Sequence, residues 1–166
     1  MSVTTDMRPQ ISSRNDHSYC IICGSRNPRS MRLRFRSGDD GVARTMFRAD
    51  PRLQGYDGII HGGVIAALLD AAMTHCLFYQ KVQGVTVDLH IRFVCSIPCE
   101  AEMEIRAWLV SSRRSLYRLK AEIESENRIA AWAEATFMPR RICGAAAKDP
   151  GRRTDSEEPC SPQSGE

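Results

Sequence analysis

The stretch HGGVIAALLD, residues 61–70, decides the fold of this chain. It sets a histidine and two glycines directly before an apolar segment, and it places one carboxylate, Asp70, inside that segment. We predict one long helix from Gly62 to about Tyr79. A buried helix rarely carries an ionised side chain without a partner or a task, because burying an unpaired charge is costly. Asp70 is therefore the first candidate for a functional residue.

The glycines at the start of this helix are a second chemical feature. Gly62 and Gly63 expose backbone N–H groups at the positive end of the helix dipole, where a developing oxyanion is stabilised. A carboxylate and an oxyanion site together indicate a hydrolytic site. Gly62 and Asp70 are eight residues apart, or about 12 Å along a helix. One carbonyl cannot contact both within one chain, so the spacing predicts a dimer with two shared sites.

Strand patterns lie on both sides of the helix. Two strands, at 31–36 and 42–48, are predicted before it, and four follow at 84–93, 100–110, 117–123 and 129–138. One helix against one face of about six antiparallel strands is an α+β arrangement. We expect a single domain over residues 18–141, between a disordered lead-in (1–17) and a disordered tail (142–166) that both lack apolar periodicity.

The composition restricts the class of protein. The chain has 166 residues, 42% of them hydrophobic and 26% charged, which is ordinary for one soluble domain. A net charge of +3 indicates no dedicated nucleic-acid partner. The weakly charged stretch 58–81 is short of a convincing membrane span, and the N-terminus lacks an apolar signal core. Seven cysteines would leave one unpaired, so we expect reduced thiols and a cytoplasmic location.

These residues resemble the hotdog-fold acyl-CoA thioesterases, in the branch that includes the phenylacetate-pathway thioesterases and their mammalian relatives. HGGVIAALLD carries the resemblance, which extends downstream through GVTVDL (84–89) and IRF (91–93). Upstream it includes CIICG (20–24) with Asn27-Pro28, and GYDG (55–58). The resemblance implies a hotdog fold, in which a central helix packs on a curved antiparallel sheet. It also implies a homodimer, or a dimer of dimers, that hydrolyses an acyl-CoA thioester without a cofactor.

The resemblance also implies roles for individual residues. Asp70 would act as general base on water or as nucleophile, and the sequence leaves both open. The N–H of Gly62 would polarise the thioester carbonyl, with Gly63 packed beside it, and His61 would orient the loop or contact the leaving group. Thr86 stands where competent relatives carry Ser or Thr, and its hydroxyl would position water near Asp70. The alternative is a threonine selected for its β-propensity.

Substrate contacts are predicted on the same basis. Met73, Thr74 and Leu77 follow Asp70 by one and two helical turns and would face the acyl group. The phosphates of coenzyme A would dock on Arg113-Arg114 and on a basic run, unless the latter is only a solvated strand face. That run comprises Arg26, Arg29, Arg32, Arg34 and Arg36.

One position departs from the family. Some relatives place a catalytically helpful Asn six residues before the motif histidine, where this chain has Gly55. An alternative function is therefore a non-catalytic hotdog protein that binds acyl-CoA or serves as a dimerisation module. A dehydratase of the same fold is disfavoured, because the motif lacks the Asp/His pairing expected of that chemistry.

The cysteines raise the question of a metal. Cys20-x-x-Cys23 and the pair Cys95 and Cys99 could supply four thiolates to zinc. The spacing of Cys95 and Cys99 differs from that of the cysteines in a zinc knuckle, and no nearby histidine is expected. We therefore predict free thiols and no metal, so that a chelator changes neither activity nor stability.

Overall fold

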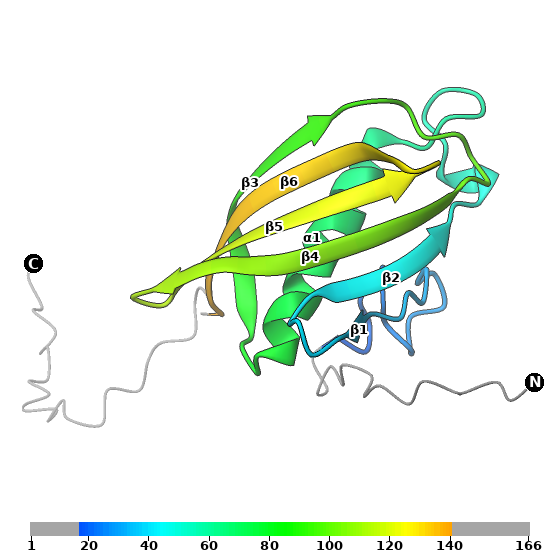
Figure 1. The fold of residues 1–166 in the computed structure, drawn as a ribbon. Helices are drawn as coiled ribbons and strands as arrows, with labels where there is room; N and C mark the ends of the chain where they lie inside the picture. The colour runs from blue at the N-terminus through cyan, green and yellow to red at the C-terminus, as the bar shows by residue number, and fades with distance from the viewer. Residues whose placement is uncertain (1–16, 141–166) are drawn as a thin grey trace, which may run out of the picture.

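The computed structural model describes residues 17–140, and Figure 1 shows their arrangement. The predicted tail, and the predicted lead-in apart from its last residue, lie outside the described residues. The elements are β1 (Arg36–Ser37), β2 (Ala43–Arg48), the 3-10 turn η1 (Pro51–Leu53), α1 (Gly62–Tyr79), β3 (Gly84–Phe93), β4 (Glu102–Arg113), β5 (Leu116–Ser125) and β6 (Arg128–Pro139). The helix has the predicted bounds, and the α+β fold class is confirmed.

The six strands form one antiparallel sheet in the order β1-β2-β4-β5-β6-β3. Helix α1 lies against one face of this sheet, and the strands curve around it (Figure 1). Strand β3, which directly follows the helix in sequence, occupies an edge and pairs only with β6 among the described strands. It therefore runs beside the helix with one side of its backbone open.

The core lies between α1 and the sheet. Alternate residues of the central strands point inward, among them Met103 and Ile105 of β4 and Leu119 of β5, all at most 1% exposed. They pack with apolar helix residues such as Leu68 and Leu69. By length and composition α1 could span a membrane, with a mean hydropathy of 1.4, but more than half of it is buried inside the fold. Its position is that of a core helix.

Residues 31–36 were predicted to form a half-buried strand. The strand prediction is wrong for most of this segment, but the predicted burial of its apolar side chains Leu33 and Phe35 is confirmed. Only Arg36 and Ser37 pair with β2. Arg32 has φ +55°, a left-handed conformation that interrupts an extended strand. The N–H of Leu33 donates to the carbonyl of Ile22 at 2.9 Å instead of to a strand. Side-chain alternation thus buries Leu33 without strand pairing.

Candidate functional site

The start of α1 is capped by the histidine of the motif. His61 is the N-cap residue, and its Nδ1 accepts a hydrogen bond from the N–H of Gly63 at 2.8 Å. The first N–H groups of a helix have no partner within the helix. No hydrogen bond from the N–H of Gly62 is found within residues 17–140. His61 therefore occupies the second amide and leaves the first, that of Gly62, available to an external acceptor.

The carboxylate of the motif has a partner on the neighbouring edge strand. The hydroxyl of Thr86 donates to Asp70 Oδ1 at 2.6 Å, a length typical of a hydrogen bond to a charged oxygen. The strand register shifts between Thr86 and Asp88, and such a bulge re-aims the side chains beside it. Asp70 is half-buried. The structure thus brings together the two residues that were predicted to act on water.

The other end of β3 meets the start of the helix. A Cβ atom added to Gly62 would lie 3.6 Å from the ring of Phe93, whose side chain is 49% exposed. Sequence analysis missed Phe93, although an aromatic residue at the end of a strand beside a glycine is a usable signal. Strand β3 therefore connects the two parts of the candidate site, with Thr86 near one end and Phe93 at the other.

The departure at Gly55 has a structural counterpart. A Cβ atom at Gly55 would lie 3.2 Å from both Cα and Cδ2 of His61, closer than most real contacts of this kind. A larger side chain at this position would press on the capping histidine. The glycine thus lets the loop of residues 55–61 fold tightly against the start of α1.

The predicted substrate contacts are not gathered at this site. Met73 and Leu77 are fully buried in the core, and Thr74 is 8% exposed. Arg113 and Arg114 lie at the β4–β5 turn, at the end of the sheet away from the start of α1 (Figure 1). Their roles stay predictions.

Part of the basic run lines a groove instead. Arg32, Arg34 and Arg36, with two arginines of β2, line an open groove of about 600 Å³ that neither Asp70 nor Gly62 contacts. Its role in binding phosphate likewise stays a prediction.

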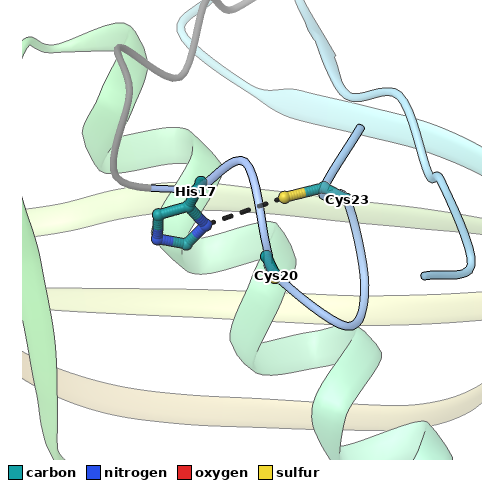
Figure 2. A group of neighbouring side chains, drawn as sticks. All are labelled: His17, Cys20 and Cys23. Carbon is teal, nitrogen blue, oxygen red and sulfur yellow. Dashed lines mark hydrogen bonds between the residues drawn. The ribbon is translucent and has the colours of Figure 1, made fainter. Parts of the chain in front are cut away.

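A second cluster of chemical groups lies near the N-terminal end of the described chain. His17, Cys20 and Cys23 place one ligand atom each within 4.8 Å of one another (Figure 2). The expectation that no histidine lies near these cysteines was therefore wrong, because His17 precedes Cys20 by three residues. Cys95 and Cys99 do not join the cluster among the described residues.

Burial perturbs the titratable groups in and beside this cluster. Burial, and secondarily Cys20, raises the pKa of the Cys23 thiol to about 12. Burial, and secondarily the charge of His17, lowers the pKa of His75 to about 4. Without a cation, both groups are therefore neutral at pH 7.

Comparisons with known proteins agree with the fold and the motif. Residues 57–131 match the family model of the thioesterase superfamily. Acyl-coenzyme A thioesterase THEM4 of Bos taurus is 26% identical over 104 residues, which are 63% of this chain and 43% of that protein. This chain thus spans less than half of that curated relative.

Solved structures extend the comparison. Thioesterase superfamily member 2 of zebra fish superposes with a TM-score of 0.63 at 18% identity, over 75% of this chain and 94% of that one. A hypothetical thioesterase from Streptococcus pneumoniae TIGR4, solved with coenzyme A, has a TM-score of 0.61 at 18% identity, over 65% of this chain and 85% of that one. At this level of identity the structures show a shared fold.

Proposed function

We propose that this chain hydrolyses an acyl-CoA thioester, because its residues 57–131 match the family model of the thioesterase superfamily and it has the predicted hotdog fold. Water adds to the thioester carbonyl, the C–S bond breaks, and the products are a free acid and the thiol of coenzyme A. The observation that carries the proposal is the 2.6 Å hydrogen bond from Thr86 to Asp70. This hydrogen bond holds the Asp70 carboxylate in place beside the edge strand β3, and it leaves the second carboxylate oxygen available to water.

Asp70 is the base, or the nucleophile, of the proposed reaction. As a base it takes a proton from water while the water oxygen attacks the carbonyl, and it returns the proton to the departing thiolate. As a nucleophile it attacks the carbonyl carbon and displaces the coenzyme A thiolate, and water then hydrolyses the resulting mixed anhydride to regenerate Asp70 and release the acid. In both cases the Thr86 hydrogen bond holds one carboxylate oxygen and thereby orients the other. The contact fits the role predicted for Thr86, whose hydroxyl oxygen can also accept a hydrogen bond from the attacking water.

The oxyanion donor in this proposal is the free amide of Gly62 on a second copy of the chain. Within one chain, Gly62 and Asp70 lie on the same helix, separated by about 12 Å. The second copy would pair along β3, the open edge of the sheet. Long exposed edge strands are a liability that proteins cover. The edge also bears exposed apolar side chains, of which Val87 is 56% and Phe93 49% exposed.

The geometry of β3 favours this pairing. Thr86 marks the position of Asp70 along the strand, and Phe93 marks the position of Gly62. If two copies of β3 pair antiparallel about a point near Leu89 and His90, Thr86 of one copy lies opposite Phe93 of the other. That register brings the carboxylate of one chain toward the free amide of its partner. Each dimer would then hold two equivalent sites.

The substrate class rests on the relatives. One curated relative is an acyl-coenzyme A thioesterase, and one structural neighbour was solved with coenzyme A. We propose coenzyme A as the carrier here, with the arginines of the sequence prediction as candidates for its phosphates. The proposal of a cytoplasmic location rests on the odd number of cysteines in the sequence, which is seven.

The first test is an assay of hydrolysis on a panel of acyl-CoA thioesters, in which the release of free coenzyme A thiol is measured. Asp70→Asn keeps the shape of the side chain and removes the base, so turnover should fall by about 10²- to 10⁴-fold. A variant that keeps more than half of wild-type activity would remove Asp70 from the mechanism. Binding of acyl-CoA without hydrolysis by the wild type would favour the non-catalytic alternative, to which Gly55 gives some support.

The second test addresses the shared site. Proline at position 62 lacks the N–H that would hold the oxyanion, so Gly62→Pro and Asp70→Asn homodimers should both be inactive. A heterodimer of the two variants has one site with both lesions and one intact site. Mixed dimers should therefore regain up to half of the wild-type activity per dimer. Folded heterodimers that stay inactive would mean that the two groups do not act across the interface.

A further inference from the structure

The segment His17–Gly24 forms a tight loop that gathers three metal-ligand side chains. The N–H of Cys20 donates to the carbonyl of His17 at 3.0 Å, and the N–H of Gly24 donates to the carbonyl of Cys20 at 2.9 Å. The N–H of Ile22 lies 3.4 Å from the sulfur of Cys20. A Cβ atom at Gly24 would lie 2.5 Å from backbone atoms of Cys20, so this turn requires glycine. The loop therefore gathers the three side chains, with the Cys23 sulfur directed toward the His17 ring (Figure 2) and all three ligand atoms within 4.8 Å of one another.

The separation of the ligand atoms fits zinc. Tetrahedral zinc binds sulfur at about 2.3 Å and imidazole nitrogen at about 2.0–2.1 Å, which puts two such atoms about 3.6 Å apart. Cys23 Sγ and His17 Nδ1 are 3.7 Å apart. Thiolate and imidazole are the donors that zinc prefers. The Cys23 and His17 ligand atoms thus already have the separation of a zinc site, and the Cys20 sulfur lies within 4.8 Å of both.

A fourth donor stands next to this loop on α1. His75 is 4% exposed, and neither of its ring nitrogens has a hydrogen-bond partner among the described residues. A buried polar group without a partner is costly. Its ring stacks on Phe35 at 4.3 Å between centroids and lies 6.3 Å from the ring of His17. Two imidazoles on one tetrahedral zinc have centroids about 5 Å apart, so the ring of His75 must move closer to His17 when both bind the same ion.

We propose that His17, Cys20, Cys23 and His75 bind one zinc ion that fastens the N-terminal loop to α1. Binding releases the two thiol protons, because the ligands are two thiolates and two neutral imidazoles. The dication stabilises the thiolate form of both cysteines. Four protein ligands leave no position for substrate, so the site is structural. This proposal replaces the expectation that chelation has no effect, and it is independent of the proposed hydrolysis.

The test begins with the metal content of the purified full-length protein. The wild type should contain about one zinc per chain, and Cys20→Ser, Cys23→Ser and His17→Asn should each contain less than about a tenth of that. Cys95→Ser and His90→Gln serve as matched controls, because they remove an exposed cysteine and an exposed histidine outside the cluster. Both controls should keep the full zinc content.

Stability gives a second readout that does not depend on activity. Removing zinc with a strong chelator should lower the melting temperature of the wild type and of both controls, and it should leave the three cluster variants unchanged. Re-adding zinc should restore the wild type. Wild-type protein that takes up no zinc with its thiols reduced, or that carries a disulfide between Cys20 and Cys23, would overturn the proposal.

X-ray absorption on the wild-type zinc protein tests the fourth ligand without a variant that must fold. The zinc shell should contain two sulfurs at about 2.3 Å and two imidazole nitrogens at about 2.0–2.1 Å. A shell with two sulfurs, one imidazole and one oxygen would overturn the assignment of His75. Stoichiometric zinc that persists in Cys20→Ser and Cys23→Ser would place the metal elsewhere and refute the whole proposal.

Discussion

Removing the hydroxyl of Thr86 tests the central contact of the proposed site. Valine has the same shape as threonine without the donor, so Thr86→Val should leave the strand intact and release Asp70 Oδ1. A hydrogen bond to a charged group contributes about 1.5–3 kcal/mol. At 1.36 kcal/mol per factor of ten, its loss lowers the rate by about 10- to 150-fold. We expect the lower half of this range, because water reaches the half-buried carboxylate and replaces part of the bond.

The assay is steady-state hydrolysis of the best acyl-CoA found in the panel, and the loss should be in kcat rather than in KM. Thr86→Ser keeps the donor and is the matched control, so it should retain most of the activity. In an Asp70→Asn background, Thr86→Val should change the residual rate by less than about threefold, because the two residues act as a unit. The reasoning fails if folded Thr86→Val stays within twofold of the wild type, or if the serine variant is equally impaired.

Two further predictions concern the fold. Cys76 is fully buried, and burial raises the pKa of its thiol to about 11, whereas Cys95 is exposed. A thiol reagent added to the native protein should therefore modify Cys95 and leave Cys76 unmodified. Equal labelling of the two cysteines in a peptide map would contradict this packing. Gly24→Ala should destabilise the protein by about 1–3 kcal/mol, since its Cβ would collide with rigid backbone. Thermal unfolding should show a fall of several degrees, with Ser25→Ala, an exposed neighbour, unchanged; an unchanged melting temperature for both would mean that the loop adapts.

The elements of this fold were predictable from the sequence because their signals are local. An apolar run behind two glycines predicts α1 with its observed ends, and period-two alternation predicts five of the six strands to within a few residues. Alternation reports burial, however, and does not report hydrogen bonding. Residues 31–36 show the difference: their apolar side chains enter the core, but the left-handed turn at Arg32 keeps most of the segment out of the sheet.

The partners of individual side chains were decided by tertiary packing. The sequence alone identified Asp70 and Thr86 as candidates, but only the position of β3 beside α1 puts their oxygens 2.6 Å apart. The sequence by itself also did not reveal that Met73 and Leu77 are enclosed in the core. Tertiary packing also places His75 beside the loop that carries His17, although these two histidines are more than 50 positions apart in the sequence. A local pattern determines which face of an element is buried, whereas the distance between two side chains depends on how separate elements pack, and no short-range periodicity encodes that.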